Sequence, residues 1–260
     1  MDKYGLFGRD IGYSFSRSYF KAKFEAENIP ASYVNFDCDT IDDVSSYLKD
    51  ESISGFNVTI PYKEDVIALL DELDTDAANI GAVNTIKRLK DGRLKGFNTD
   101  FLGFRGTLLE ELGDVLFPDF KAEITLDAKL QSAHKALILG TGGASKAIVY
   151  ALESLGVSCQ YISRKRTKDT WSYDELDKEK IQNATFIVNC TPLGTFPDVH
   201  LFPDIPYSYL DSRHIVFDLI YNPPQSQFLA LAKAQKATTI NGLRMLELQA
   251  EASWNIWLAP

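Results

Sequence analysis

The sequence predicts an α/β protein with two domains, and three observations lead to that prediction. First, the apolar run from Ala136 to Leu139 reads as a buried strand that passes through a glycine turn into a helix. Second, residues 4–60 alternate between strand-like and helix-like segments, which is typical of an α/β domain with a largely parallel sheet. Third, a chain of 260 residues is long enough for two domains of ordinary size.

The N-terminal part is expected to contain strands at 4–7, 32–36 and 53–60 and helices at about 18–28 and 40–49. Ser14 and Ser16 precede the first helix, and their hydroxyls face the same way if that segment is extended. Such a pair could bind a carboxylate or a diol. It could equally be a helix N-cap and its neighbour, and the local sequence leaves both interpretations open.

The strand that runs to Ile60 carries polar side chains on one face, because Asn57 and Thr59 are spaced by two residues. Pro61 cannot continue a central strand, so the chain is expected to leave the sheet there. Lys63 is therefore expected at the carboxyl end of the strand, where α/β sheets place their ligands. In isolation, a lysine at such a position is more often a solvated surface residue.

The next segment is predicted to be a hairpin followed by a helix. Asp91-Gly92 lies between two strand-like runs, which is a strong hairpin signal. Asn84 and the run from Asn98 to Asp100 place polar groups where a folded chain is usually apolar or ends an element. That run could also simply cap the helix that begins near Phe101.

A second domain is predicted beyond residues 113–134, where a proline, several charges and weak periodicity indicate a boundary. Its first strand leads into a turn that contains Gly140, Gly142 and Gly143 and then into a helix. In such a unit the backbone N–H groups and the positive helix terminus face a pyrophosphate. Ser145 replaces the third glycine of the usual pattern, so the string alone is a weak signal.

The following strand, at 157–162, ends about 20 residues beyond the glycine turn, where a dinucleotide-binding domain reads the ribose. An NAD-binding domain places Asp or Glu there. This chain instead has Ser163, Arg164, Lys165 and Arg166, with three cations and no carboxylate. The pattern therefore favours NADP, whose 2′-phosphate needs positive charge, and the alternative is a solvated basic turn.

The remainder of this domain is expected to contain strands at 185–189, 215–220 and 238–240, a helix around 228–236, and a last helix that starts at Gly242. Gln249 on the last helix is of a type that is more often exposed than functional. One side of that helix carries the residues Leu246, Ala250, Ser253 and Trp257.

Composition and charge argue against several classes of protein. The net charge is −9, and the short basic run at 163–168 is no stripe for nucleic acid. No apolar run approaches the ~18 residues of a membrane span, and no signal peptide is recognisable. The three cysteines and three histidines are scattered without metal-ligand spacing, so we expect no metal and reduced thiols in a cytoplasmic protein.

Together these motifs resemble the shikimate dehydrogenase family along almost the whole chain. Each string alone is weak, but eight in the family's order form a specific signal. The strings are Ser14-Phe-Ser16, Asn57-Val-Thr-Ile-Pro-Tyr-Lys63, Gly81-Ala-Val-Asn-Thr85, Gly96-Phe-Asn-Thr-Asp100, Gly140-Thr-Gly-Gly-Ala-Ser145, Asn189-Cys-Thr-Pro-Leu-Gly194, Asp218-Leu-Ile-Tyr-Asn-Pro223, and Asn241-Gly-Leu243 with Gln249.

The resemblance implies roles for particular residues. Lys63 and Asp100 are implied to be the catalytic pair. The implied substrate-binding residues are Ser14, Ser16, Asn57, Thr59, Asn84, Tyr221 and Gln249. The implied cofactor-binding residues are Gly140, Gly142, Gly143, Ala144, Ser145, Ser163, Arg164, Lys165, Thr191, Leu219 and Gly242. The chain departs from the family pattern at Tyr13, Arg17, Lys165 and Arg244, and its segment 113–134 looks longer than the family norm.

The implied fold has an N-terminal α/β substrate domain with a mainly parallel sheet, made of residues 1–103 and 241–260. Residues 104–240 are implied to form a Rossmann-like NADP-binding domain, and the C-terminal helix returns to the substrate domain. The implied reaction is the reversible NADPH-dependent reduction of 3-dehydroshikimate to shikimate, on the route to chorismate and aromatic amino acids, by a cytoplasmic monomer or homodimer.

Two alternatives remain open at this point. One is a quinate/shikimate dehydrogenase with relaxed substrate or cofactor choice, although the basic run at 163–166 argues against NAD. The other is a non-catalytic ligand sensor on the same scaffold. Retention of both Lys63 and Asp100 argues against a sensor, because binding alone does not need a pair of groups for proton transfer.

Overall fold

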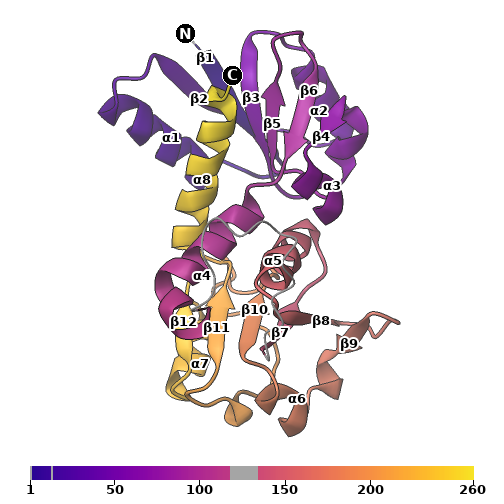
Figure 1. Cartoon of the computed structure of the whole chain (residues 1–260), viewed down its shortest axis with the longest axis vertical. Helices are drawn as coiled ribbons and strands as arrows, with labels where there is room; N and C mark the ends of the chain where they lie inside the picture. The colour runs from indigo at the N-terminus through magenta and orange to yellow at the C-terminus, as the bar shows by residue number, and fades with distance from the viewer. Residues whose placement is uncertain (1, 13, 118–133) are drawn as a thin grey trace. The chain divides into compact units, whose positions relative to one another are not determined.

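The computed structural model describes residues 2–12, 14–117 and 134–260 (Figure 1). It divides into two compact units, unit 1 (Met1–Phe104 with Leu246–Pro260) and unit 2 (Arg105–Met245). Most of the segment 113–134 and the residue Tyr13 lie outside the described residues. Residues 241–245 group with unit 2 rather than with the end of the chain, because the Gly242 N–H donates to the carbonyl of Ile220.

Unit 1 is built on a mixed six-stranded sheet with the order β2-β1-β3-β5-β6-β4. Among these strands β5 is the one that runs antiparallel to its neighbours, so the sheet is mainly parallel, as predicted. The strands are β1 (Asp2–Gly8), β2 (Ala31–Asp37), β3 (Ile53–Val58), β4 (Glu72–Leu73), β5 (Thr85–Arg88) and β6 (Leu94–Phe97). The Asp91-Gly92 turn joins β5 to β6, so the predicted hairpin is confirmed.

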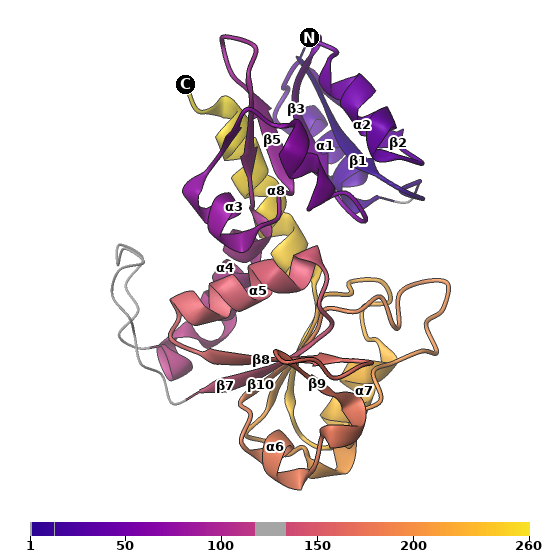
Figure 2. The same ribbon diagram turned by 90° about the vertical axis from the view of Figure 1, so that its right-hand side faces the viewer.

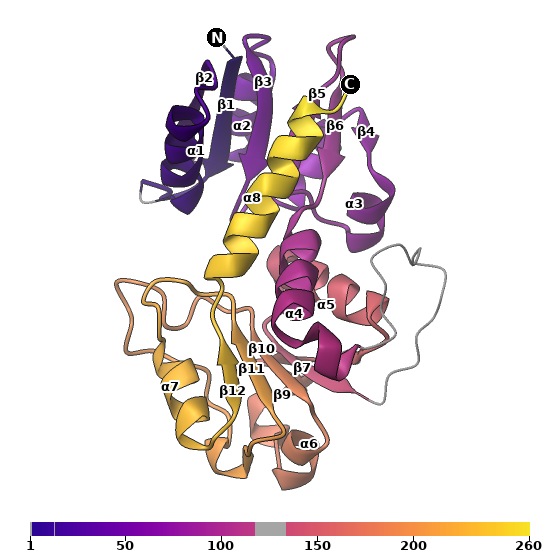
Figure 3. The ribbon, with the colours of Figure 1, turned by 60° about the vertical axis from the view of Figure 1, so that its left-hand side comes forward.

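Helices cover both faces of this sheet (Figure 3). One face packs against α1 (Phe15–Ala26) and α8 (Leu243–Leu258), with Phe20, Trp254 and Trp257 in its apolar cluster. The other face packs against α2 (Ile41–Leu48), the 3₁₀ helix η1 (Asp65–Leu69) and α3 (Thr75–Ile80). Because side chains alternate along a strand, residues such as Asn57 face α8 while Phe56 faces the other layer.

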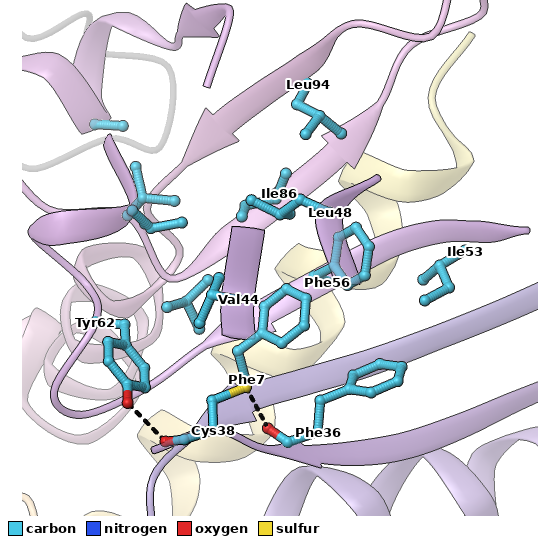
Figure 4. Packing of buried hydrophobic residues seen from close by; sticks show 14 residues of the cluster. Phe7, Phe36, Cys38, Val44, Leu48, Ile53, Phe56, Tyr62, Ile86 and Leu94 are labelled. Atoms are coloured by element: carbon cyan, nitrogen blue, oxygen red, sulfur yellow. Dashed lines mark hydrogen bonds between the residues drawn. The ribbon is translucent and has the colours of Figure 1, made fainter. Parts of the chain in front are cut away.

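Aromatic rings form the centre of the apolar cluster between the sheet of unit 1 and the layer formed by α2, η1 and α3 (Figure 4). The rings of Phe7 and Phe56 stack with centroids 4.6 Å apart, and Phe36 packs on Phe7 at 5.3 Å. At the edge of this cluster the Tyr62 hydroxyl donates to the carbonyl oxygen of Cys38 at 2.6 Å. That bond fixes the chain just before Lys63, so the apolar core supports the start of the candidate site.

The first helix begins earlier than the sequence predicts, and this corrects one interpretation. α1 starts at Phe15 rather than near Ser18, with Ser14 at its N-cap and Ser16 in its first turn. Ser14 and Ser16 are therefore not two residues of an extended segment, and the condition for a shared facing is not met. Their positions are those of the second interpretation, a helix N-cap and its neighbour. Although Ser14 is the N-cap residue, its side chain makes no capping hydrogen bond to the helix.

Unit 2 is a doubly wound sheet of six parallel strands with the order β12-β11-β10-β7-β8-β9, all of which are labelled in Figure 1. Counted from its own first strand this order is 3-2-1-4-5-6, the arrangement of dinucleotide-binding domains. The strands are β7 (Lys135–Leu139), β8 (Ser158–Ser163), β9 (Thr170–Ser172), β10 (Phe186–Asn189), β11 (Ile215–Asp218) and β12 (Thr238–Ile240). The predicted Rossmann-like sheet is confirmed.

The helices of unit 2 lie on both faces of its sheet (Figure 2). α5 (Gly143–Ser154) packs on β7 and β8 through its buried stripe of Ala147, Ile148 and Ala151. The opposite layer contains η2 (Tyr173–Glu175), α6 (Lys178–Gln182), η3 (Tyr207–Tyr209) and α7 (Gln227–Ala234). The boundaries between the two units fall within α4 (Asp100–Leu116) and α8.

No helix in the described part of the chain combines the length and the apolarity that a membrane span requires.

Candidate active site

Lys63 and Asp100 form a largely buried ion pair in unit 1. The Lys63 Nζ lies 2.6 Å from Asp100 Oδ2, and the two side chains are only 13% and 8% exposed. Lys63 lies beyond the end of β3, where Pro61 takes the chain out of the sheet. Asp100 begins α4, where the positive helix terminus favours a carboxylate. The two residues that the resemblance implies as a catalytic pair are thus in direct contact.

Asn84 holds the second oxygen of that carboxylate. Its Nδ2 donates to Asp100 Oδ1 at 2.8 Å, and its Oδ1 accepts from the backbone N–H of Thr99 at 2.6 Å. A backbone N–H can only donate, so this contact fixes which end of the amide faces Asp100. Gln249 Oε1 lies 3.4 Å from the same Nδ2, which brings the last helix to this site.

Two sequence interpretations are settled by these contacts. Asn98 Oδ1 accepts from the backbone N–H of Asp100 at 3.0 Å, so Asn98 does cap α4, as the alternative interpretation held. The cap does not use the Asp100 side chain, which remains with Lys63 and Asn84. Gln249 is only 6% exposed, so the general expectation that a glutamine at its position is exposed is wrong here.

Asn57 lies in the same buried network and makes hydrogen bonds to several protein groups. Its Oδ1 accepts from the Tyr33 hydroxyl at 2.8 Å, and its Nδ2 donates to Ser253 Oγ at 3.0 Å and to Thr85 Oγ1 at 3.1 Å. The Tyr33 hydroxyl also interacts with the Ser16 side chain, and burial raises the pKa of Tyr33, so the phenol keeps its proton. Ser16 is therefore linked to the network through Tyr33.

Sequence reasoning assigned no role to Tyr33, Thr85, Thr99 or Ser253, although all four belong to this network. Ser253 carried a signal, because it is a polar residue on the stripe that also holds Ala250 and Trp257. Thr59 follows β3 and is half-buried. Tyr221 follows β11 in unit 2 and is also half-buried.

The glycine turn of unit 2 follows β7, at the point where the strand order of the sheet reverses between β7 and β10. Gly140 has a φ of +106°, which favours glycine, and a Cβ there would lie 3.1 Å from Thr191 Cγ2 and 3.3 Å from the Cys190 backbone. Gly142 is the N-cap of α5 and faces open space, with nothing within 4 Å of where its Cβ would be. The turn thus leaves the helix N-terminus open to an anion.

The other residues of this turn have supporting contacts. Ser145 is fully buried, and its Oγ donates to the Gly142 carbonyl at 2.7 Å, so its hydroxyl stabilises the turn. Gly143 and Ala144 form the first turn of α5. Thr191 is fixed from the next loop, because its N–H and its hydroxyl both donate to Asn189 Oδ1, at 3.0 and 2.6 Å.

A buried carboxylate lies behind that loop. Asp218 Oδ1 accepts from Asn189 Nδ2 at 3.0 Å and from the Ile220 N–H at 3.1 Å, and its Oδ2 accepts from the Ser226 hydroxyl. Burial raises the pKa of Asp218 to about 6, against the opposing effect of these hydrogen bonds. Asp218 thereby orients Asn189, and Asn189 orients Thr191 beside the glycine turn.

The end of β8, which the predicted cations follow, lies next to the glycine turn, because the Gly140 N–H donates to the carbonyl of Ile162. Ser163 ends β8, and Arg164 and Lys165 are exposed beyond it. Arg166 pairs with Glu175. Within the described ranges no carboxylate forms an ion pair with Arg164 or Lys165, so both remain available to a ligand phosphate.

Leu219 and Gly242, implied to lie together beside the cofactor, are in contact. A Cβ on Gly242 would overlap the Leu219 carbonyl group, so only glycine permits this approach of the two loops. Arg244, one of the departures from the family pattern, forms a bidentate ion pair with Glu110 at 2.7 and 2.9 Å. Tyr13, another departure, lies outside the described residues, and no group of candidate metal ligands occurs among those that are described.

These features fit a dinucleotide with a 2′-phosphate: an open glycine turn at a helix N-terminus, a strand end with cations in place of a carboxylate, and two loops held in contact by Gly242. Unit 1 adds a buried amine and carboxylate 2.6 Å apart, the kind of pair that can transfer a proton. The fold and these two sites are those of a dinucleotide-dependent oxidoreductase.

Comparison with known proteins specifies the family. Residues 6–86 match the family model of the shikimate dehydrogenase substrate binding domain. The chain is 36% identical over 269 residues to the NADP-dependent shikimate dehydrogenase of Methanococcus maripaludis, covering 97% of this chain and 90% of that relative. The chain belongs to the shikimate dehydrogenase family.

Solved structures agree with this assignment. A crystal structure of a shikimate dehydrogenase in complex with NADP+ has a TM-score of 0.82 to this chain at 32% identity, covering 99% of this chain and 90% of that one. A shikimate 5-dehydrogenase of Thermus thermophilus, solved with NADP(H) and shikimate, has a TM-score of 0.81 at 29% identity, covering 99% and 94%.

Proposed function

We propose that this chain catalyses the reversible NADPH-dependent reduction of 3-dehydroshikimate to shikimate, on the route to chorismate and aromatic amino acids. The observation that carries the proposal is the buried contact between Lys63 and Asp100, 2.6 Å apart, in a chain whose relatives are named as NADP-dependent shikimate dehydrogenases. We further propose that unit 1 is the substrate domain and unit 2 the cofactor domain, in a cytoplasmic monomer or homodimer.

The residues that would hold the cofactor belong to unit 2. The N–H groups at the Gly142–Ser145 start of α5 would bind the pyrophosphate, and Arg164 and Lys165 would bind the 2′-phosphate. Leu219 and Gly242 would lie beside the nicotinamide, as the family resemblance implies. When bound, the nicotinamide supplies the hydride, and the protein must orient the substrate and manage one proton.

Lys63 is proposed to exchange that proton with the oxygen at the reacting carbon. Its ammonium donates to Asp100 Oδ2, so the carboxylate fixes the position of the amine and, with it, the direction of proton transfer. Asp100 is fixed in turn by Asn84 and by its own place at the start of α4. The low exposure of both side chains excludes most water from the pair, which strengthens their interaction.

Most of the residues proposed to bind the polar groups of the substrate belong to unit 1, and Tyr221 belongs to unit 2. Ser14 and Ser16, at the start of α1, are assigned to the carboxylate, and Thr59, Asn84 and Gln249 to the hydroxyl and carbonyl groups. Tyr221 is assigned to the same substrate by family resemblance. Asn57 also matches the family's substrate-binding pattern, although its hydrogen bonds are made to protein groups.

The direct test is the absorbance of NADPH when 3-dehydroshikimate is added to the purified chain. We expect oxidation of NADPH with a much smaller rate for NADH, and the reverse reaction with shikimate and NADP+. Quinate with each cofactor distinguishes the relaxed quinate/shikimate dehydrogenase. Binding of shikimate without any turnover, under conditions where an authentic shikimate dehydrogenase is active, would contradict the proposal and support a ligand sensor.

A further inference from the structure

Three hydroxyl groups are in mutual contact in the interior of unit 1, and we call them the hydroxyl cluster: Thr85 of β5, Thr99 before α4, and Ser253 of α8. Their oxygens are 2.8 Å (Thr85–Ser253), 3.1 Å (Thr99–Ser253) and 3.3 Å (Thr85–Thr99) apart. All three residues are fully buried. Burying a hydroxyl is costly unless its hydrogen-bonding capacity is used, so the partners of the hydroxyl cluster indicate what it does.

The hydroxyl cluster joins two amides. On one side Asn57 Nδ2 donates to Ser253 and to Thr85. On the other side Asn84 Oδ1 lies 3.0 Å from the Thr85 hydroxyl and 3.2 Å from that of Thr99, in addition to the Thr99 N–H. The Thr99 N–H and the Thr85 hydroxyl therefore keep the oxygen of Asn84 turned inward. Its Nδ2 then donates to the Thr99 hydroxyl at 3.0 Å and to Asp100 Oδ1 at 2.8 Å, the second oxygen of the carboxylate that contacts Lys63.

Asn57 has little capacity left for a substrate. Its oxygen accepts from Tyr33, and its two N–H hydrogens have three protein acceptors, including the carbonyl of Asn84 at 3.2 Å. The residue is only 4% exposed. Its contacts are those of a link between Tyr33 and the hydroxyl cluster.

We propose that Ser253 is a positioning residue for the reaction. It connects Asn57 of β3 with Thr85 and Thr99, and through them it fixes the Asn84 amide and the Asp100 carboxylate in the orientation that Lys63 requires. Asn57 acts within this network rather than as a ligand of the substrate. This inference rests on the proposed function, because it assigns the purpose of the network to the Lys63–Asp100 pair.

The kinetic test uses variants that remove a hydroxyl and variants that keep it. Ser253→Ala and Thr85→Val are expected to lower kcat about tenfold each, the effect of losing one buried hydrogen bond at the reacting pair, with KM for shikimate changed less than about threefold. Thr85→Ser keeps the hydroxyl and should retain kcat within about twofold of the parent chain. The Ser253 hydroxyl donates to the Gln249 carbonyl of its own helix at 2.9 Å, and the Ser154 hydroxyl of α5 donates in the same way to the Ala151 carbonyl at 2.7 Å. Ser154→Ala is therefore the matched control and should leave kcat unchanged.

A double-mutant cycle separates this role from a general loss of packing. Because Ser253 and Thr85 act on the same amides, Ser253→Ala combined with Thr85→Val should lower kcat clearly less than the product of the two single effects. The proposal would be overturned if the effects of Ser253→Ala and Thr85→Val on kcat simply multiply in the double variant. It would also be overturned if Ser253→Ala keeps kcat within twofold of the parent chain, or if Thr85→Ser loses as much kcat as Thr85→Val.

A spectroscopic measurement keeps this test distinct from the test of the proposed function. In ¹H–¹⁵N NMR spectra of the full chain, the side-chain amide hydrogens of Asn57 and Asn84 should exchange slowly with solvent, and Ser253→Ala should accelerate both at least tenfold. Unchanged exchange in this variant refutes the positioning role whatever the activity. If the parent chain fails to turn over shikimate while the NMR effect is present, the proposed function fails and the network stands as described.

Discussion

Replacing Lys63 with arginine separates proton transfer from structural support at the candidate active site. Arginine keeps a positive charge opposite Asp100, so the ion pair can persist, but a guanidinium does not release its proton at any working pH. Replacement with alanine removes both functions. The two variants together therefore show whether Lys63 acts as a proton-transfer group or only as a counter-charge.

The expected sizes follow from the burial and the contacts of the pair. Positioned proton transfer contributes about 10²–10⁴-fold in rate, so Lys63→Arg and Lys63→Ala should each lose roughly that in kcat, with a modest change in KM. Stability should differ between them. Lys63→Ala leaves a carboxylate that is 8% exposed without its cation, at a cost on the order of 3 kcal/mol. Lys63→Arg should unfold close to the temperature of the parent chain.

The assay is steady-state oxidation of shikimate by NADP+, with thermal unfolding of the same samples measured by circular dichroism. The reasoning is refuted if Lys63→Arg keeps near-parental kcat, because a group that cannot give up its proton would then suffice. It is also refuted if kcat of each variant falls only in proportion to the loss of folded protein. Added methylamine should partly restore the activity of Lys63→Ala and should have no effect on Lys63→Arg.

Three further predictions concern unit 2. Arg164→Ala should raise KM for NADPH about tenfold and leave KM for NADH unchanged, whereas Arg166→Ala should change either KM far less because that guanidinium is paired with Glu175. Gly142→Ala should keep the parental unfolding temperature, since nothing lies within 4 Å of the new Cβ, but it should weaken NADPH binding as measured by calorimetry. Gly242→Ala should lower both the unfolding temperature and the affinity for NADPH, because its Cβ overlaps Leu219. Asp218 has a folded-state pKa of about 6 against an ordinary value of 3.8, so its contribution to stability, about 3 kcal/mol, is fully present below pH 3.8 and lost as pH rises through about 6. In urea unfolding, the free energy of unfolding of Asp218→Asn should therefore not show the loss that the parent chain shows as pH rises through about 6. The same pH dependence of this free energy in both proteins would contradict the raised pKa.

Local patterns predicted those parts of the fold in which sequence neighbours determine the structure. The glycine turn after β7 and the Asp91-Gly92 hairpin were recognisable because each needs particular backbone conformations, seen as φ values of +106° at Gly140 and +89° at Gly92. The short β4 and β9 escaped prediction, because two or three residues show no periodicity and these strands exist through pairing with β6 and β8. The start of α1 was misplaced because the helix was recognised from Phe20 and Phe24, which lie within it and do not mark where it begins.

In the candidate site, too, local sequence patterns predicted some features, and others depend on contacts between distant parts of the chain. Lys63 could be placed at a strand end from Pro61 and the alternation of polar residues, but only the fold shows that Asp100, 37 residues away in sequence, lies 2.6 Å from it. Tyr33 gave no functional signal, and Ser253 was recognisable only as a polar residue on the stripe with Ala250 and Trp257. Their roles depend on contacts between elements far apart in the chain. Tyr33 is 24 residues from Asn57, and Ser253 is 196 residues from it. The spacing of residues in sequence predicts neighbours within one helix or strand, and it does not predict contacts such as Tyr33–Asn57 or Ser253–Asn57.

Both units have an asparagine that orients a buried aspartate. The aspartates differ in their other partners, and this difference explains why only Asp100 is assigned to proton transfer. In each, an asparagine accepts from the backbone N–H of a threonine and donates to an aspartate: Asn84 to Asp100 at 2.8 Å, and Asn189 to Asp218 at 3.0 Å. Around Asp218 the donors are neutral, and burial raises its pKa, so the group orients a loop without a partner for proton exchange. Asp100 instead contacts an ammonium that has a proton to give. A cation introduced beside Asp218 would not create a second active site, because the carboxylate is fully buried beneath Asn189 and Ser226 and no substrate could reach it.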